Sequence, residues 1–354
     1  MVKIKVAING FCRVGRSVFK IAQSRSDIEI AAIRTHLSAE QCAYLLKHDS
    51  IYGHYAKAIG TGEASLYVGD RIIPIISDKR TTKLPWNDLG IDVLIDAGCQ
   101  TDAAELRRHR TAGARRVASL SQCADFATIV MGVNDGLVNV STDIVCSGDA
   151  AISSVAPVIA VLDQAVGVEA TTITATGNYH FAGSLLKTER LGDSDLVAMA
   201  ADYGQRLQAV LPNVASAVSG LAISSHQYGN VGLSTVSLLL REPAAVKKIN
   251  EILTHAAREP LYNGILAVTD KELVAEDFRG NSYSSTVDAG LTTVVGERLA
   301  QVSAWYDGEW ASANRLVELA AETGRYARNV WHIYNKIAEK AKNKYKSLDI
   351  YRKV

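Results

Sequence analysis

The chain has 354 residues, of which 48% are hydrophobic and 21% charged, a balance typical of a globular protein long enough for two domains. Its formal net charge of +1 excludes a strong overall field that would attract nucleic acid or an anionic membrane. The longest nearly apolar run, residues 155–162, is far shorter than the roughly 20 residues that a membrane-spanning helix needs. We therefore expect no association with membranes, and nucleic acid is not an expected partner.

The first half of the chain alternates apolar runs with amphipathic segments. Residues 6–10 and 28–34 have the pattern of buried strands, and the segment RVGRSVFKIAQS between them has helical spacing. Such alternation predicts a largely parallel, doubly wound sheet of the Rossmann type over residues 1–147. Further strand-like runs continue this pattern at residues 91–98, 114–120, 127–133 and 142–148.

From about residue 148 the sequence pattern changes. Residues 157–164 and 196–211 are predicted to be helical, and between and after them come longer, β-branched runs. This predicts a second, α+β domain over residues 148–311 with a mostly antiparallel sheet, and a return helix at about residues 312–325 that docks on the first domain. The β-branched runs are residues 168–176, 220–225 and 232–242.

The last segment, residues 326–354, has a different composition. From Arg325 onward there are nine Lys and Arg against two acidic residues. One interpretation is a C-terminal helix packed on its own domain or on a neighbouring subunit; the other is a basic amphipathic helix for a partner, a nucleic acid or a membrane surface. The stripe that predicts a helix consists of Val330, Tyr334, Ile337, Ala341 and Tyr345.

The cysteines indicate a reducing environment. The chain begins with a strand-like segment and not with a signal peptide, so we expect reduced thiols and a cytoplasmic protein. Converging thiols could hold a metal or form a redox switch, but the irregular spacing, without a CxxC pair, favours packing as small hydrophobic residues, and no metal site is predicted. The five cysteines are Cys12, Cys42, Cys99, Cys123 and Cys146.

A glycine-rich loop follows the first strand, in the segment AINGFCRVGR. Gly10 and Gly15 occupy the first and third positions of a dinucleotide-binding fingerprint, which would put a pyrophosphate at the N-terminus of the following helix. The middle glycine is replaced by Cys12, whose side chain would weaken the site or displace the ligand. The candidate cofactor-binding residues here are Asn9, Gly10, Phe11, Cys12, Arg13 and Val14, with Gly98 after a central strand.

The corner after the second strand lacks the acid that usually binds the ribose hydroxyls. Arg34, Thr35 and His36 stand there instead. An arginine suits a 2′-phosphate, so NADP, NAD or another phosphate-rich ligand is considered, with loss of nucleotide binding as the alternative.

Five longer stretches are similar to segments of one known family: VKIKVAINGFCRVGR, LLKHDSIYGHY, VMGVN, NSYSSTVDAG and SAWYDGEWASANRLVEL. The chain resembles the glyceraldehyde-3-phosphate dehydrogenase family over about residues 3 to 325. The resemblance implies a Rossmann domain, a catalytic domain with an antiparallel sheet, and usually a homotetramer. It further implies a cysteine thiolate that attacks an aldehyde, hydride transfer to NAD and release of the acyl group by phosphate.

The resemblance also identifies what is missing. The family's SNASCTTNCLAP aligns with CSGDAAISSVAP, so the nucleophilic cysteine falls on Ala150. Thioester chemistry is therefore not expected at this position. The other functional positions of the family fall on Thr171, Thr176 or Gly177 for the histidine, Ala201 for a phosphate-binding threonine, Ser225 or His226 for an arginine, Gly308 for the asparagine that holds the nicotinamide, and Thr35 for the ribose acid.

Other polar residues occupy the neighbourhood of the lost groups. If the fold holds, they should face one interdomain crevice, where Asp, His and Tyr together could perform acid/base chemistry without redox. The alternative is that they are exposed loop residues without a shared role. These candidates are Asp149, Tyr179, His180, His226 and Tyr228.

Three hypotheses for function follow. The preferred one is a crevice repurposed for a non-redox reaction of a small molecule. The second is a non-catalytic protein that senses a nucleotide or joins a true dehydrogenase in a mixed oligomer. The third is an NADP-linked oxidoreductase acting on an alcohol or ketone. The resemblance favours a homotetramer, and the second hypothesis adds a hetero-oligomer with a true dehydrogenase as the alternative.

Overall fold

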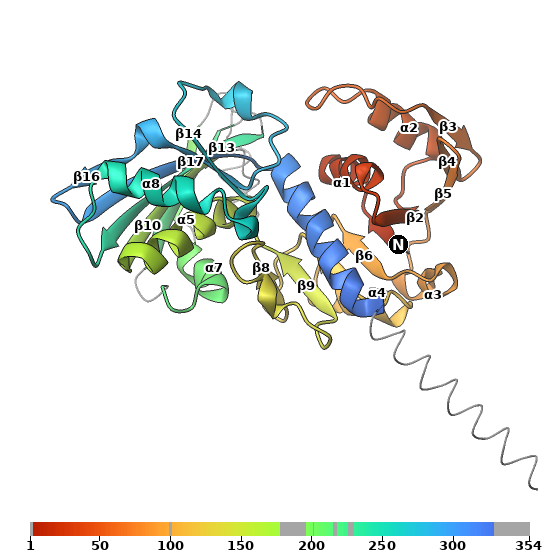
Figure 1. The fold of residues 1–354 in the computed structure, drawn as a ribbon. Coiled ribbons are helices and arrows are strands. Elements are labelled where there is room, and N and C mark those ends of the chain that lie inside the picture. Colours follow the sequence, from red (N-terminus) through yellow and green to blue (C-terminus); the bar gives the residue numbers. More distant parts are fainter. Residues whose placement is uncertain are drawn as a thin grey trace, which may run out of the picture.

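The computed structural model describes residues 3–98, 101–177, 196–200, 202–214, 218–225 and 230–328, and it describes side chains in these ranges except at 196–200, 224 and 225. The described chain forms two sheets, each with helices packed against it (Figure 1).

The first sheet has nine strands among the described residues, in the order β3-β4-β5-β2-β1-β6-β7-β9-β8. The strands from β5 to β8 in this order run parallel, whereas β3, β4 and β5 pair with each other in antiparallel fashion at one edge. The strands are β1 (Ile4–Asn9), β2 (Ile28–Arg34), β3 (Ile59–Gly62), β4 (Ser65–Val68), β5 (Arg71–Ile76), β6 (Val93–Asp96), β7 (Val117–Ser119), β8 (Ala127–Ile129) and β9 (Ile144–Ser147).

Helices connect these strands and bury their apolar faces on the sheet. Phe19 of the first helix is fully buried with Ile8 and Ile33 of the two central strands, in a core on one face of the parallel sheet. A separate core, which includes Trp86 and Leu106, covers the other face. The helices are α1 (Arg13–Ser24), α2 (Ala39–Lys47), α3 (Trp86–Leu89) and α4 (Ala103–Thr111). The Rossmann-type, doubly wound sheet predicted from the sequence is therefore present.

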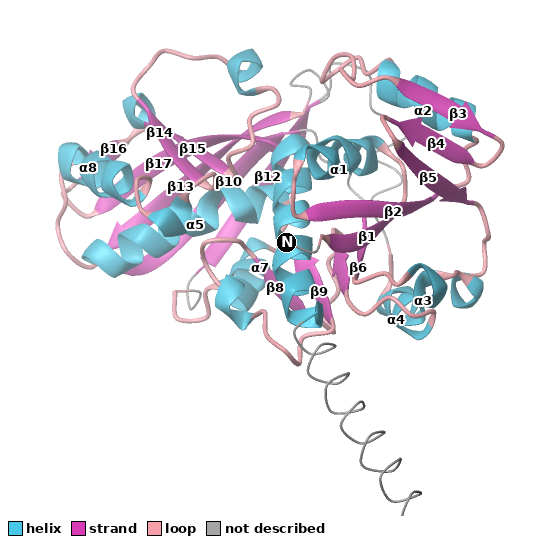
Figure 2. Cartoon of the chain, turned by 45° about the vertical axis from the view of Figure 1, so that its right-hand side comes forward, coloured by secondary structure: helices cyan, strands magenta, loops and turns pink. Residues whose placement is uncertain are grey.

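The second sheet has eight strands in the described chain and is mixed but mostly antiparallel, with parallel pairs only at β10–β12 and β14–β15. Helices α5 and α8 lie against one face of it (Figure 2). Its elements are α5 (Ala150–Val166), β10 (Val168–Gly177), β11 (Leu196–Ala200), α7 (Tyr203–Val210), β12 (Val218–Ser225), β13 (Val231–Leu240), α8 (Val246–Ala256), β14 (Leu266–Thr269), β15 (Ser285–Asp288), β16 (Thr293–Val295) and β17 (Leu299–Asp307).

After β17 the chain returns to the first domain. Residues 310–328 are helical, a longer stretch than the predicted 312–325. Leu316, Val317 and Ala320 of this helix belong to the core of the first sheet. Figure 1 shows the helix in blue, running towards α4. Residues 329–354, with the predicted stripe, lie outside the described residues.

Two predictions about the second domain were wrong in detail. Residues 196–200 are a strand, not part of a helix, because they pair in antiparallel fashion with β12 from Leu196↔Ser225 to Ala200↔Leu221. This tertiary pairing outweighs the helix propensity of Leu, Ala and Met. The helix predicted to begin at Pro157 begins at Ala150 instead, and Pro157 lies inside it.

Candidate functional site

A pocket of about 490 Å³ lies at the carboxyl ends of β1, β2 and β6. In open parallel sheets this edge, next to the first strand–helix turn, is where nucleotides bind. Its lining contains seven of the nine residues predicted to bind a cofactor. The pocket is lined by Asn9, Gly10, Phe11, Cys12, Arg16, Arg34, Thr35, His36, Leu37, Ser77, Asp78, Lys79, Ala97 and Gly98.

The glycine loop has a backbone that only glycine suits at two positions. Gly10 has a φ of +92°, and a Cβ on Gly15 would lie 2.2 Å from the Gly10 carbonyl oxygen. Cys12 is different: it has an extended backbone (φ −66°, ψ −174°) as the N-cap of α1, which any residue can adopt. Its Sγ lies 3.4 Å from the Ala97 carbonyl oxygen. The loop therefore keeps its fingerprint geometry, although the cysteine adds a side chain to the pocket wall.

A buried acidic residue, Asp96, forms a hydrogen bond with Asn9 at the start of the glycine loop. Asp96, the last residue of β6, is fully buried and accepts hydrogen bonds from Asn9 Nδ2 (2.7 Å) and Ser119 Oγ (2.7 Å). Burial raises the pKa of this carboxyl group above its ordinary value, against the effect of its hydrogen bonds. We interpret Asp96 as a support that fixes Asn9, since it is not among the residues that line the pocket.

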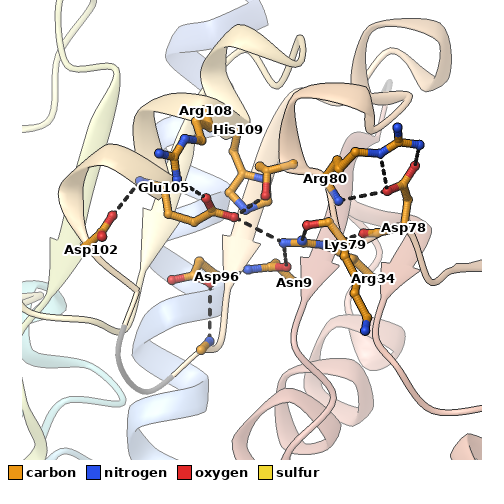
Figure 3. Close-up of polar contacts among 12 residues, drawn as sticks. Asn9, Arg34, Asp78, Lys79, Arg80, Asp96, Asp102, Glu105, Arg108 and His109 are labelled. Atoms are coloured by element: carbon orange, nitrogen blue, oxygen red, sulfur yellow. Dashed lines mark hydrogen bonds and ion pairs between the residues drawn. The ribbon is translucent and has the colours of Figure 1, made fainter.

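Arg34 connects the end of β2 with the loop that follows β5. Its guanidinium donates to Asn9 Oδ1 (3.1 Å), to the Asp78 carbonyl (3.3 Å) and to the Lys79 carbonyl (3.0 Å). Glu105 of α4 lies 3.6 Å from the same guanidinium, and the Arg34 side chain is 17% exposed. Figure 3 shows Arg34 between Asn9 and the Asp78–Lys79 segment. The Arg34 side chain therefore joins the glycine loop to the segment after β5 on this side of the pocket.

Thr35 occupies the position directly after β2 where an acid would bind ribose hydroxyls. It is buried, and its Oγ1 accepts a hydrogen bond from the Leu37 backbone N–H (3.3 Å). Asp78 also lines the pocket, but its carboxylate accepts from the Arg80 backbone N–H (2.8 Å) and from the Arg80 guanidinium (3.4 Å). These bonds, the backbone one first, hold the pKa of Asp78 below its ordinary value. The described lining therefore carries more positive than negative charge.

The N-terminus of α5 consists of Asp149, which stabilises the helix, followed by Ala150. Asp149 is the N-cap: its Oδ1 accepts from the Ile152 backbone N–H (3.0 Å), and its Oδ2 lies 3.2 Å from the Arg206 guanidinium of α7. Ala150 is the first residue of the helix. A Cβ built on Gly308, in the turn after β17, would lie 4.0 Å from the Ala150 Cβ. Residues from two distant parts of the second domain therefore meet here.

Comparison with protein families identifies both halves of the chain. Residues 4–103 match the model described as glyceraldehyde 3-phosphate dehydrogenase, NAD binding domain, and residues 151–308 match the model of the C-terminal domain of the same enzyme. The chain belongs to the glyceraldehyde-3-phosphate dehydrogenase family.

Individual relatives agree with this membership over most of the chain. Glyceraldehyde-3-phosphate dehydrogenase 2 of Bacillus subtilis (strain 168) is 32% identical, over 90% of this chain and 96% of its own length. Glyceraldehyde-3-phosphate dehydrogenase 2 of Streptomyces arenae is 32% identical, over 91% and 98%. The chloroplastic glyceraldehyde-3-phosphate dehydrogenase A of Nicotiana tabacum is 34% identical, over 90% and 84%.

In this family member, two predicted cofactor residues lie away from the pocket lining. Arg13 forms an ion pair with Glu309 (2.7 Å), and Val14 is buried against the core. Glu309 also accepts from Asn230 Nδ2 (2.8 Å), and its burial raises the pKa of its carboxyl group. The Arg13–Glu309 pair therefore ties the start of α1 to the segment that follows the second sheet.

Of the five residues predicted to form an acid/base site, the structure describes Asp149. Asp149 caps α5 and pairs with Arg206, which gives it a structural role. Tyr179, His180, His226 and Tyr228 lie outside the described residues, so their proximity stays a prediction.

The described cysteines are packed as small hydrophobic residues in most cases. Cys42 and Cys146 are fully buried, and burial raises the pKa of their thiols to about 11 and about 12. Cys123 is half-buried and its pKa is also raised by burial. Cys99 lies outside the described residues. Among the residues that the structure describes, no group of three or more His, Cys, Asp or Glu could hold a metal ion, and no helix is long and apolar enough to cross a bilayer.

Some lining residues were missed by the sequence analysis. Ser77, Asp78 and Lys79 follow β5, whose sequence RIIPII was not recognised as a strand parallel to β2. Recognising that strand would have placed its end at the same edge of the sheet. Arg16 and Ala97 also line the pocket. Residues close to them in the sequence were predicted to bind a cofactor, but no sequence motif identified these two residues themselves.

Proposed function

We propose that this chain is a dinucleotide-binding member of the glyceraldehyde-3-phosphate dehydrogenase family that does not oxidise glyceraldehyde 3-phosphate through a thioester. The observation that carries the proposal is Ala150 at the first position of α5, where the resemblance puts the nucleophilic cysteine. A methyl group cannot attack an aldehyde or hold an acyl group.

The described surroundings of Ala150 support this reading. Cys146 is the nearest preceding cysteine in the sequence, but it lies in β9, is fully buried and has a pKa raised to about 12, so its thiol is not a nucleophile at neutral pH. Asp149 is engaged as a helix cap and with Arg206.

The pocket supports retention of a dinucleotide. Gly10 and Gly15 keep the fingerprint geometry at the N-terminus of α1, which favours a pyrophosphate. Arg16 lines the pocket, and its Nε is buried without a hydrogen-bond partner among the described residues. NAD or NADP would be held by this loop and by the Arg34 side of the pocket, and its nicotinamide would supply a hydride acceptor or donor.

Two alternatives remain as hypotheses. A crevice repurposed for a non-redox acid/base reaction depends on Tyr179, His180, His226 and Tyr228, and the structural role of Asp149 weakens it. A non-catalytic role, sensing a nucleotide or forming a mixed oligomer with a true dehydrogenase, is compatible with the same pocket. A homotetramer and a cytoplasmic location stay predictions.

The test combines activity and binding. Purified protein is assayed for oxidation of glyceraldehyde 3-phosphate with NAD and with NADP, beside the Bacillus subtilis relative as a positive control. Dinucleotide binding is measured by calorimetry. We expect no phosphate-dependent turnover together with saturable dinucleotide binding. Turnover near that of the control would overturn the first half of the proposal, and the lack of heat with both dinucleotides would overturn the second.

A further inference from the structure

We propose that His48 and His54 form a surface site for a divalent transition-metal ion, Zn²⁺ or an ion of similar ligand preference, with water in the remaining coordination positions. His48 is the C-cap of α2, and His54 lies in the loop between α2 and β3. Both side chains are exposed, and neither lines the pocket at the carboxyl ends of β1, β2 and β6. The proposal is therefore independent of dinucleotide binding.

The two imidazole rings lie at a separation that suits one shared cation. Their centroids are 5.6 Å apart, and the angle between their planes is 81°. Zn²⁺ binds imidazole nitrogen at about 2.0–2.1 Å in tetrahedral geometry, so two imidazoles on one ion have centroids about 5 Å apart. Because both side chains are exposed, small rotations about their side-chain bonds can bring both rings onto one ion.

A hydrogen bond fixes the tautomer of the neutral His54 ring. Its Nδ1 lies 2.6 Å from the Lys47 carbonyl oxygen. A carbonyl oxygen only accepts, so Nδ1 carries the proton and Nε2 keeps its lone pair for a ligand. Histidines that bind metals almost always donate their second ring N–H in this way. The His48 side chain has no hydrogen bond within the described chain, so its ring nitrogens are also available.

The loop between the two histidines is held in its turn by a neighbouring acid. The Asp49 carboxylate accepts hydrogen bonds from the Ile51 and Tyr52 backbone N–H groups, both at 3.0 Å. It also forms an ion pair with Lys20 of α1 (2.6 Å), in which both side chains are less than a tenth exposed. Asp49 is therefore a support of the loop and not a third ligand. A cation would bind to a loop that is already ordered, which lowers the entropy cost of binding.

Tyr44 holds the ring of His48 in place. The two residues are one turn apart on α2, and their ring centroids are 4.6 Å apart at an angle of 43°. The contact is made by the aromatic ring, so a phenylalanine could make it as well. We assign Tyr44 as a positioning residue that acts through His48.

The same loop also contacts the second domain. The Tyr52 hydroxyl donates to Asp307 Oδ1 (2.8 Å), and its ring lies against Trp310, with the centroids 4.9 Å apart. A cation held by His48 and His54 would join the two ends of the segment that carries Tyr52. Bound zinc should therefore slow the local opening of residues 48–54.

The test titrates zinc chloride into the full chain in a calorimeter, with magnesium chloride as the comparison salt. The natural protein should bind one equivalent of zinc more than the double variant His48→Ala/His54→Ala, and each single variant should weaken this binding at least about tenfold. Magnesium, which prefers oxygen ligands, should not distinguish the proteins. His255→Ala is the matched control, because His255 is also exposed but lies 3.7 Å from a Glu259 carboxylate oxygen, not beside a second histidine.

Two further measurements test the positioning by Tyr44 and the effect on the loop. Tyr44→Ala should weaken zinc binding by about two- to tenfold, and Tyr44→Phe should bind zinc like the natural protein. Hydrogen exchange of residues 48–54 should become slower on addition of zinc in the natural protein and in His255→Ala. It should not respond to zinc in the double variant.

Each contrary outcome overturns a stated part of the proposal. Equal zinc binding by the natural protein and the double variant would overturn the site itself. A loss in His255→Ala as large as in His48→Ala would show binding to imidazoles in general, and would overturn it too. Zinc-dependent association of the chain that requires both histidines, seen by size-exclusion chromatography, would overturn the assignment of both ligands to one chain. Equal binding by Tyr44→Ala and the natural protein would overturn the role of Tyr44.

Discussion

The Arg206 guanidinium lies 3.2 Å from the Asp149 carboxylate, and the same carboxylate caps the first turn of α5. One acidic side chain thus joins two helices of the second domain immediately before Ala150. Asp149 therefore stabilises the fold, as the N-cap of α5 and as the ion-pair partner of Arg206, independently of any reaction at this end of the helix.

Substitutions of Asp149 test its contribution to the stability of the protein. Asp149→Ala should lower the free energy of unfolding by about 1–2 kcal/mol, mostly through loss of the N-cap. Asp149→Asn should cost much less, because an amide oxygen can still accept from Ile152 N–H. Asp202→Ala removes the other acidic partner of Arg206, an exposed one, and should cost less than about 0.5 kcal/mol. Urea unfolding measures the free energy of unfolding of all three variants. Equal losses of stability in Asp149→Ala and Asp149→Asn would contradict the role of Asp149 as the N-cap.

Gly15→Ala should disrupt the glycine loop. Its Cβ would lie 2.2 Å from the Gly10 carbonyl oxygen, so the backbone must move, and we expect a loss of about 3 kcal/mol and weaker dinucleotide binding. Gly136→Ala is the matched control, since a Cβ there meets no atom within 4 Å. Thermal unfolding and calorimetry measure the two effects. A Gly15→Ala protein as stable as the control would show that the loop is not packed as described.

His109 makes the stability of the protein depend on pH. It is fully buried, accepts a hydrogen bond from Trp86 Nε1 (3.1 Å), and burial lowers its pKa to about 4. Because the unfolded chain binds the proton near pH 6.5, it holds more protons than the folded chain between about pH 4 and pH 6.5. Stability should therefore fall on acidification through this window.

The size of this effect is measurable by a variant. Between about pH 7 and about pH 5 the contribution of His109 amounts to about 2 kcal/mol. His109→Gln keeps an acceptor for Trp86 but does not titrate, so it should lose less stability over this interval. Urea titrations at both pH values provide the comparison. Identical pH profiles for the two proteins would refute the role of His109.

Asp92 anchors the last described turn of the helix over residues 310–328. Its side chain is 2% exposed and is bonded by Arg115 (2.6 Å) and by Arg328 (2.7 Å). Asp92→Ala leaves two guanidinium groups without their acid and should cost about 3–5 kcal/mol. Arg328→Ala leaves Arg115 in place and should cost about 1 kcal/mol. Arg325→Ala, on an exposed side chain, is the control; if Asp92→Ala costs no more than the control, the anchor is unimportant.

Much of the fold was predictable because the first domain is governed by local patterns. Residues 6–10, 13–24 and 28–34 have buried apolar positions at strand or helix spacing, and the structure has elements there. Residues 196–200 failed because their pairing with β12, distant in sequence, decides their conformation. The helix predicted over residues 157–164 begins earlier, at Ala150, because proline is typical of a first helical turn but here lies inside the helix.

The candidate site was only partly predictable. The glycine loop, Arg34 and Thr35 were found because each has a fixed place after a predicted strand. Lys79 was missed, since its position depends on β5 lying beside β2 and on a guanidinium that crosses between them. The role of Asp149 as a cap was also missed, since the helix was expected to begin seven residues later, at Pro157 instead of Ala150.

The anchor at Asp92 has a practical consequence. Asp92 directly precedes β6, whereas the pocket lies at the opposite, carboxyl end of that strand. The chain therefore leaves its last described turn, at Arg328, on the far edge of the sheet from the nucleotide corner. A fluorophore, an affinity handle or an immobilisation linker joined to this turn lies at the edge remote from the pocket, so surface-coupled binding measurements can be made with the pocket facing solution.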